Sequence, residues 1–163
     1  MTRYLAATTY GGSTVEFMAI DSLNRTLGDY YPRVRPFGGS GTYQIELAQG
    51  SATLGLGTPQ DIVMTSTDVV AVRDVYMASG ITYTISVTVG AATQDAELFL
   101  VQSDPTVEST WIRTRATTLR SATAAGPGGT ETITITPTVT GWYGLVLINK
   151  AGSGRYTLSK TSS

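Results

Sequence analysis

Cysteine and histidine are both absent from the 163 residues of this chain. Without cysteine there is no disulfide framework, no thiolate metal site and no cysteine nucleophile. Without histidine there is no Ser-His-Asp triad and no imidazole metal ligand, and most hydrolytic mechanisms lose their usual proton carrier. Aspartate and glutamate leave a carboxylate pair of the glycosidase type open, but no spacing singles one out. We therefore expect a protein that is not an enzyme.

Strong charge of either sign and long apolar runs are also missing. The 11 Lys and Arg residues nearly balance the 12 Asp and Glu residues, which gives a net charge of -1. The basic residues are scattered, so the chain has neither the footprint of a nucleic-acid-binding protein nor a polybasic patch for an anionic membrane. No apolar run approaches the roughly 20 residues that cross a bilayer as a helix.

The remaining composition bears on location. Threonine, serine and glycine are abundant, whereas lysine occurs only as Lys150 and Lys160. This composition is typical of secreted or surface-exposed bacterial proteins, so we expect an extracellular or cell-surface location. Residues 1–4 lead directly into a Thr- and Gly-rich pattern, without the apolar segment of a signal peptide. An exported chain is then expected here as a mature form or an excised piece.

Apolar and polar residues alternate with a period of two. From Ile81 to Val89 the odd positions are apolar and the even ones are Thr or Ser, as in a strand with one buried face. Leu98 and Leu100 share a face in the next segment, and Thr occupies every even position from 130 to 140. No helical stretch of useful length interrupts this pattern. The sequence predicts an all-β protein, an antiparallel β-sandwich or jelly roll.

The expected strands cover residues 3–9, 13–21, 29–37, 41–48, 61–67, 71–78, 81–89, 95–102, 110–118, 130–136, 142–150 and 154–160.

A strand-turn-strand pattern occurs twice along the chain. The first copy consists of Gly28, Tyr30, Gly39, Ser40, Gly41 and Tyr43, and each residue recurs 113 positions later, as Gly141, Tyr143, Gly152, Ser153, Gly154 and Tyr156. A fixed register of Gly and Tyr indicates one supersecondary unit used twice. We interpret this unit as a hairpin in which the tyrosines are core residues and the turn glycines favour positive φ.

The second copy closes a longer series of motifs. The series runs Asp74-Val-Tyr76, Ala78-Ser-Gly80, Tyr83-Thr-Ile-Ser-Val87, Asp95-Ala-Glu-Leu98-Phe-Leu100, Gly141-Trp-Tyr143 and Gly152-Ser-Gly154-Arg-Tyr156-Thr-Leu158. It resembles the bacterial pre-peptidase C-terminal domain over about residues 60–160. The resemblance implies a small noncatalytic jelly-roll sandwich that is attached to secreted proteases and other exported proteins. It also implies a role in binding substrate or matrix and, in collagenase relatives, calcium.

Three parts of the chain are expected from this resemblance. Residues 1–49 form a partial or small β domain with the closing unit of the repeat, residues 50–57 a Gly-rich linker or crossover, and residues 58–163 the complete sandwich. Either the first part begins inside a preceding domain, or a shortened N-terminal sandwich packs against the complete one. Residues 122–129 are expected to form a long exposed hairpin or loop tip.

Candidate binding residues are Arg and aromatic side chains. Arg33 and Arg35 alternate with aromatic residues on one strand, where a guanidinium group is able to bind carboxylates or a sugar acid. A second basic patch consists of Trp111 with Arg113, Arg115 and Arg120. The alternative for Arg33 and Arg35 is a solvated face or a domain interface, and the alternative for the second patch is a hairpin that lies over the edge of the core.

Differences between the two copies single out further candidates. Trp142 stands where the first copy has Asp29, so its ring is free for stacking against a sugar. Arg33 and Arg35 stand where the second copy has Val146 and Ile148.

A calcium site is the one metal centre that the composition leaves open. Asp61 and Asp95 are hard oxygen donors of the kind that calcium prefers, and Asp95 matches the family's Asp by position. No dense Asp-x-Asp-x-Asp spacing is present, so either residue is equally interpreted as a turn residue at the start of a strand. We expect no cofactor, with calcium as the possible exception.

Two functions are compatible with these patterns. The first is a noncatalytic module of an exported bacterial protein that binds a polysaccharide, a protein or a matrix surface. The second is a self-assembling subunit or repeat of a surface layer, sheath or filament, whose partner is a further copy of itself. They differ in whether the edge strands pair with another chain.

Overall fold

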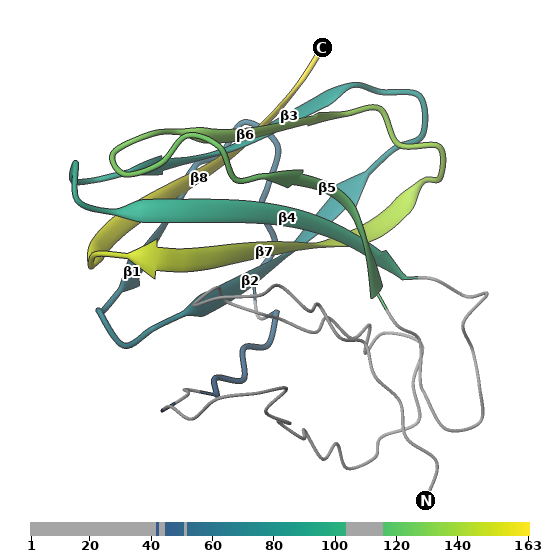
Figure 1. Cartoon of the computed structure of the whole chain (residues 1–163). Helices are drawn as coiled ribbons and strands as arrows, with labels where there is room; N and C mark the ends of the chain where they lie inside the picture. The colour runs from purple at the N-terminus through teal and green to yellow at the C-terminus, as the bar shows by residue number, and fades with distance from the viewer. Residues whose placement is uncertain (1–41, 43–44, 51, 104–115) are drawn as a thin grey trace, which may run out of the picture.

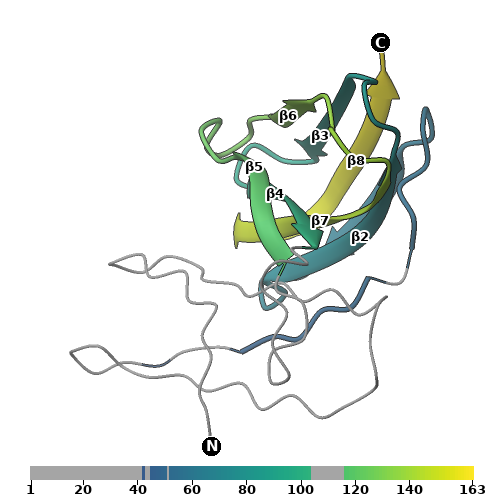
Figure 2. The same ribbon diagram turned by 90° about the vertical axis from the view of Figure 1, so that its right-hand side faces the viewer.

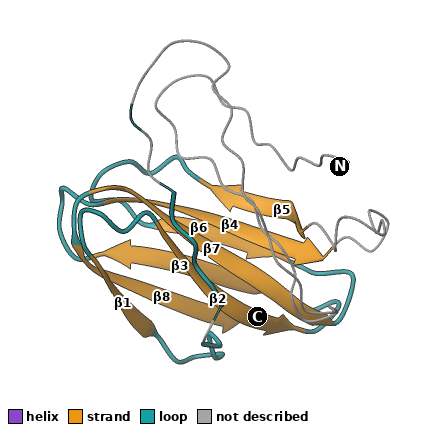
Figure 3. Cartoon of the chain, turned by 90° about the horizontal axis from the view of Figure 1, so that it is seen from below, coloured by secondary structure: helices purple, strands orange, loops and turns teal. Residues whose placement is uncertain are grey.

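The computed structural model describes residues 42, 45–50, 52–103 and 116–163. Within these residues strands are joined by loops and turns, and there is no helix (Figure 3). These residues therefore contain no helix that is long and apolar enough to span a bilayer. The strands are β1 (Gln60–Met64), β2 (Val70–Met77), β3 (Tyr83–Val89), β4 (Asp95–Ser103), β5 (Ala116–Ala122), β6 (Glu131–Ile135), β7 (Gly141–Ala151) and β8 (Gly154–Ser162). The predicted all-β class is confirmed.

The strands form two antiparallel sheets that pack face to face (Figure 1). One sheet has the order β1-β8-β3-β6 and the other the order β2-β7-β4-β5. Consecutive strands belong to different sheets at every connection except the one between β4 and β5. Eight strands in this order are a jelly-roll sandwich, as the sequence pattern predicted.

The predicted closing hairpin between β7 and β8 is wrong. β7 pairs with β2 and β4, whereas β8 pairs with β1 and β3, so the turn at Gly152 carries the chain from one sheet to the other. Alternation shows which face of a strand is buried, but it does not show which strand lies beside it. The loop between Ala122 and Glu131 likewise joins β5 to β6 in the opposite sheet, so it is not a hairpin.

The strand boundaries differ from the predicted ones mainly near turns. Ser79 and Gly80 form a turn, in which Gly80 has a φ of 78°, and the next two residues are not in a strand, so β3 begins at Tyr83. β5 begins at Ala116, later than the predicted segment 110–118, whose first residues lie outside the described part. Residues 45–48 are described and are not in a strand. The predicted strands 3–9, 13–21 and 29–37 lie outside the described residues.

The core lies between the two sheets and takes one face of each strand. Tyr83, Ile85 and Val87 are buried, as their alternation with Thr and Ser predicted, and Leu98 and Leu100 face them from β4. Larger buried side chains from the remaining strands complete the core, namely Ile62, Met77, Ile133, Ile135, Leu145, Leu147, Tyr156 and Leu158. Burial of this apolar surface is the main driving force for the sandwich.

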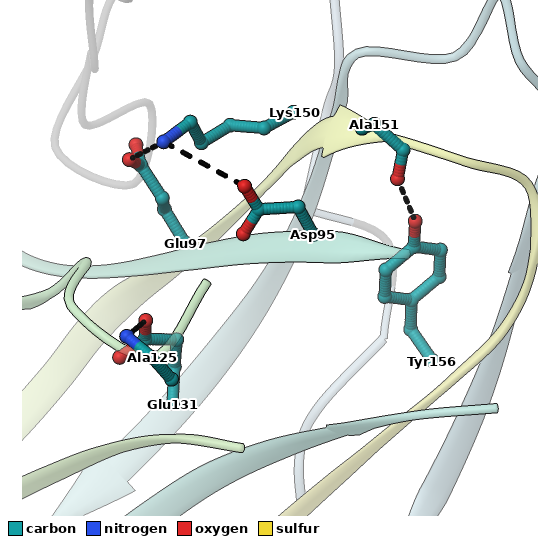
Figure 4. A network of polar contacts seen from close by, with 7 residues as sticks. All are labelled: Asp95, Glu97, Ala125, Glu131, Lys150, Ala151 and Tyr156. Atoms are coloured by element: carbon teal, nitrogen blue, oxygen red, sulfur yellow. Dashed lines mark hydrogen bonds and ion pairs between the residues drawn. The ribbon is translucent and has the colours of Figure 1, made fainter. Parts of the chain in front are cut away.

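A buried hydrogen-bond network fixes the turn between β7 and β8. The Tyr156 hydroxyl donates to Asn149 Oδ1 at 2.6 Å and approaches the Ala151 carbonyl at 3.3 Å (Figure 4). Asn149 Nδ2 in turn lies within 3.2 Å of the carbonyl oxygens of Thr65, Asp68 and Gly152. The network therefore ties the β7–β8 turn to the connection between β1 and β2.

Glycine is required at position 152 of this turn. Its φ is 83°, and a Cβ atom there would lie 2.8 Å from Gln94 Cα. Gln94 itself accepts a hydrogen bond from the Ala91 amide and donates one to the Arg155 carbonyl. Gly154 also has a positive φ, of 128°. In the second copy of the repeat, the Gly residues thus permit the tight turn by which the chain crosses from one sheet to the other, and Tyr156 holds that turn by a hydrogen bond.

Residues 52–57, within the expected Gly-rich linker, are bonded to the sandwich. Leu54 is fully buried in the core, and its amide donates to the Asp74 carbonyl at 2.9 Å. The Asp74 amide donates to the Ala52 carbonyl at 3.0 Å, and the Gly57 amide to the Lys160 carbonyl at 2.8 Å. The segment thereby covers part of the free edge of β2, which otherwise invites pairing with another chain. The division of the chain at residue 49 stays a prediction.

Lys160 is a buried cation between the sheets. Its Nζ donates to the Tyr76 carbonyl at 3.1 Å and lies 5.9 Å from the centroid of the Tyr83 ring. Burial lowers the pKa of Lys160 below the usual lysine value, because the charged form loses hydration.

We predict that the Tyr156–Asn149 contact contributes more to stability than an ordinary surface contact. Tyr156→Phe keeps the ring and removes the hydroxyl, so the free energy of unfolding should fall by about 1–2 kcal/mol. Asn149→Ala leaves several buried carbonyls unsatisfied and should cost about 2–4 kcal/mol. Denaturant titration measures both. Tyr76→Phe on the exposed face is the control, and an equal effect of Tyr156→Phe and the control would contradict the assignment.

We also predict a pH-dependent penalty at Lys160. Because its pKa is lowered in the folded state, the unfolded chain binds the proton more tightly, and stability should rise as pH increases toward about 10.5. Lys160→Met should be more stable than the wild type by about 1 kcal/mol at pH 7. The difference in free energy of unfolding between the two proteins should shrink between pH 7 and pH 10. A difference that is constant over this range would show that the charge on Lys160 carries no penalty.

Candidate functional site

The described residues contain only some of the candidates that the sequence singled out. Trp142, Asp61 and Asp95 are described, together with the structural residues Gly141, Tyr143, Gly154 and Tyr156. The binding candidates Arg33, Arg35, Trp111, Arg113 and Arg115, and the first-copy residues Gly28, Tyr30, Gly41 and Tyr43, lie outside the described part. Tyr143 and Tyr156 both lie in the core.

Trp142 lies beside Tyr76 on the outer face of the β2-β7-β4-β5 sheet. The two residues are in register on β7 and β2. Their ring centroids are 5.3 Å apart and the ring planes meet at 65°. The exposed fractions are 49% for Trp142 and 47% for Tyr76, so each ring retains a surface for a ligand. We call these two residues the aromatic pair.

Two connecting loops hold the backbone next to the aromatic pair. The Ser79 amide donates to Thr140 Oγ1 at 2.8 Å, and the Ser79 hydroxyl donates to the Thr138 carbonyl at 2.9 Å. The Tyr143 hydroxyl donates to the Val139 carbonyl at 2.5 Å, and burial raises the pKa of Tyr143. These bonds join the loop after β2 to the loop before β7. The aromatic pair is therefore presented by well-supported backbone, which lowers the entropy cost of binding.

Tyr76 is a site residue that sequence reasoning did not select. Tyr76 belongs to the Asp74-Val-Tyr76 motif, but one sequence does not show that β2 and β7 are neighbours. Two aromatic side chains directly opposite each other on adjacent strands are in contact, and such pairs stabilise sheets. The signal that would have found Tyr76 is the register of β2 against β7.

The calcium candidates are on opposite sheets and each has a cationic neighbour. Asp61 on β1 accepts a hydrogen bond from Thr157 Oγ1 at 2.6 Å and lies 3.5 Å from Arg155 Nη1. Asp95 on β4 lies 3.8 Å from Lys150 Nζ, which also lies 3.0 Å from Glu97 Oε1 (Figure 4). The hydrogen bond and charge of Glu97, followed by Asp95, raise the pKa of Lys150. The structure does not bring Asp61 and Asp95 together.

Two other carboxylates in the described part accept hydrogen bonds from backbone amides. Glu131 is buried, and its Oε1 accepts a hydrogen bond from the Ala125 amide (Figure 4). Asp68 accepts bonds from the amide and hydroxyl of Thr65, which lower its pKa. Across residues 45–50, 52–103 and 116–163, no three acidic side chains gather into a group that would hold a metal ion.

Comparison with solved structures gives likenesses of fold. The chain is similar to a surface-associated copper-binding protein, CorA of Methylomicrobium album BG8, with 12% identity over 70% of this chain and 98% of that chain and a TM-score of 0.52. It is similar to the pre-peptidase C-terminal domain of collagenase from Bacillus anthracis, with 18% identity over 73% of this chain and 99% of that chain and a TM-score of 0.49.

A periplasmic inhibitor of g-type lysozyme from Aeromonas hydrophila, PliG, is also similar, with 8% identity over 72% of this chain, 100% of that chain and a TM-score of 0.46. The chain has a fold like that of a pre-peptidase C-terminal domain. At these identities the likenesses concern the fold alone. No protein-family model matches the chain, and a search of curated proteins gives no match either.

We predict that Asp61 and Asp95 do not form a calcium site. Calcium bound at 100 times its Kd would stabilise the folded state by about 2.7 kcal/mol, so a real site is measurable as a shift in Tm. The shift between calcium and chelator should be the same in the wild type and in the variants Asp61→Asn and Asp95→Asn. A calcium-dependent shift that is present in the wild type and lost in either variant would contradict this.

Proposed function

We propose that the chain is a noncatalytic binding module of an exported bacterial protein, and that the aromatic pair is its contact surface. The observation that carries this proposal is the position of Tyr76 and Trp142, two half-exposed rings in register on one rigid sheet. Aromatic residues contribute most of the binding energy at many interfaces, because they offer a large apolar area with few rotatable bonds.

A carbohydrate is the ligand class that this surface fits best. The apolar face of a sugar ring packs flat on an aromatic ring, and the 65° angle between Tyr76 and Trp142 gives the surface two differently oriented walls. The hydroxyl-rich loops with Ser79, Thr138 and Thr140 lie at the same end of the sheet, and their side chains are exposed. An exposed polar rim around an aromatic centre is the common arrangement of a binding surface.

A role in binding without catalysis is supported by the absence of cysteine and histidine from the sequence, which removes thiol nucleophiles and the usual proton carrier. The fold likeness to a surface-associated protein supports a location outside the cytoplasm.

The proposal is tested by co-sedimentation of the chain with a panel of insoluble polysaccharides. Trp142→Ala and Tyr76→Ala should each weaken binding by about tenfold or more, since removal of a central aromatic residue costs 2 kcal/mol or more. Val63→Ala, at an exposed apolar residue of β1 in the other sheet, is the matched control. Binding that is unaffected by all three changes would exclude the aromatic pair as the contact surface.

Self-assembly is the competing function, and analytical ultracentrifugation separates it from binding. A chain that remains monomeric at micromolar concentration and binds a polysaccharide agrees with the module. A chain that forms polymers, and that loses them on Trp142→Ala, would show that the aromatic pair contacts another copy instead.

A further inference from the structure

The outer face of the β2-β7-β4-β5 sheet carries an apolar patch across β2, β7 and β4, which is flanked by Asp74 and by the ion pair of Glu97 with Lys150. The outward side chains of the three neighbouring strands are in register as Val70 with Ile148, Val72 with Val146, and Val146 with Phe99. Val101, Val146 and Ile148 form a cluster separate from the main core, with Val70 and Phe99 packed against it. We call this surface the outer apolar face, and it consists of Val70, Val72, Phe99, Val101, Val146 and Ile148.

The outer apolar face is more deeply buried than an open sheet face. The exposed fractions of Val101, Val146 and Ile148 are 5%, 4% and 1%, whereas Trp142, near the beginning of β7, is 49% exposed. In β7 the run from Leu145 to Ile148 is buried at every position. A strand that is buried on both faces has a layer of protein on each side of its sheet.

The opposite sheet provides the comparison. Its outward residues are mainly hydroxyl-bearing and partly or fully exposed, namely Thr84, Ser86, Thr88, Thr132, Thr134, Thr157, Ser159 and Thr161. Ser86 and Ser159 share a hydrogen bond of 2.8 Å on this face. This sheet alternates apolar inside with polar outside, as expected for a sheet with one face in water. The outer face of the β1-β8-β3-β6 sheet is therefore suited to contact with water, whereas the outer apolar face is suited to contact with protein.

The preceding part of the chain reaches the sandwich beside the outer apolar face. Glu46 Oε2 accepts hydrogen bonds from the amides of Val69 and Val70, at the beginning of β2. Figure 2 shows the blue segment that contains residues 45–50 passing close to β2. Gly50 lies against Asp74, since a Cβ atom on it would be 2.9 Å from the Asp74 carboxylate. Asp74 is the outward residue next to Val72 on β2.

Residues 45–50 themselves do not supply the cover. Ile45 and Leu47, the apolar residues of this segment, have exposed fractions of 56% and 96%. The residues that bury the outer apolar face must therefore lie in another part of the chain. Residues 1–44 are joined directly to the segment 45–50, which is anchored at Glu46. Their sequence is suited to covering that face, because Tyr30 and Val34 alternate with Arg33 and Arg35 in the segment 29–37. One side of such a strand is apolar and the other charged.

We propose that the outer apolar face is the docking surface for residues 1–44 of the same chain. The N-terminal part then forms a third layer on the sandwich, held by apolar contacts with Val146, Ile148 and Phe99 and by the anchor at Glu46. The aromatic pair lies at the far end of the same sheet face and stays exposed beyond this layer. This inference is independent of the proposed carbohydrate binding.

Photo-crosslinking in the full chain tests the docking. The chain has no cysteine, so Val72→Cys provides a single attachment point for a benzophenone maleimide on the outer apolar face. Thr134→Cys places the same label on the outer face of the opposite sheet. After irradiation, peptide mapping should find crosslinks from position 72 to residues 1–44 and none from position 134. Crosslinks from position 72 only to residues 104–115, or to a second copy of the chain, would overturn the proposal.

Hydrogen exchange provides a second measurement that does not depend on a bulky label. Amides within residues 1–44 should be protected in the wild type, and Val146→Lys should reduce that protection by at least about tenfold while β3 and β8 remain protected. Ser159→Lys on the opposite face is the matched control and should leave residues 1–44 unchanged. Free exchange of residues 1–44 in the wild type would overturn the proposal, as would protection that disappears on dilution.

Discussion

The hydrogen bond between Tyr156 and Asn149 is the contact on which the closing of the sandwich depends. It joins β8 to β7, two strands that are consecutive in sequence but belong to different sheets. Asn149 also bonds the connection between β1 and β2 through the carbonyls of Thr65 and Asp68. Gln94, from the connection between β3 and β4, bonds the Arg155 carbonyl and accepts a bond from the Gly128 amide. Several crossings between the sheets therefore meet at one end of the molecule, in a buried network whose partners depend on each other.

This contact also distinguishes the two copies of the repeat. The position in the first copy that corresponds to Asn149 is Pro36, which has no side-chain amide. The first copy therefore lacks the side-chain amide that closes the sandwich in the second copy, although its Gly and Tyr residues are kept. At the two positions that correspond to Val146 and Ile148, the first copy has Arg33 and Arg35. Val146 and Ile148 lie at the centre of the outer apolar face. These sequence differences agree with the proposal that residues 1–44 dock on the complete sandwich.

The sequence predicted the parts of the fold that depend on local alternation. Tyr83, Ile85 and Val87 were expected on a buried face and lie there, because an apolar side chain on every second residue has one side to bury. The partner of each strand was not predictable in this way. The β7–β8 turn looks like a hairpin because its glycines permit a tight reversal, yet the buried polar group at Asn149 holds it as a crossing between sheets.

The candidate site likewise has one residue that the sequence identified and others that only the strand pairing reveals. Trp142 was identified from a difference between two copies, which is a property of the sequence. Tyr76 and the outer apolar face become visible only when β2, β7 and β4 are in register, because they are formed by residues far apart in the chain. Leu54 is a further residue whose place in the core was not predicted from the sequence. In a Gly-rich segment predicted as a linker, one leucine inserts into the core, and composition alone does not reveal such an insertion.

Whether β7 and β8 pair with each other is the most direct test of the jelly-roll topology, and backbone nuclear Overhauser contacts in the full chain measure it. A jelly roll requires cross-strand contacts at Val72–Val146 and Val87–Leu158, with no backbone contacts between β7 and β8 beyond their turn. Contacts between the α protons of Leu147 and Leu158, which a hairpin would place opposite each other, would contradict it.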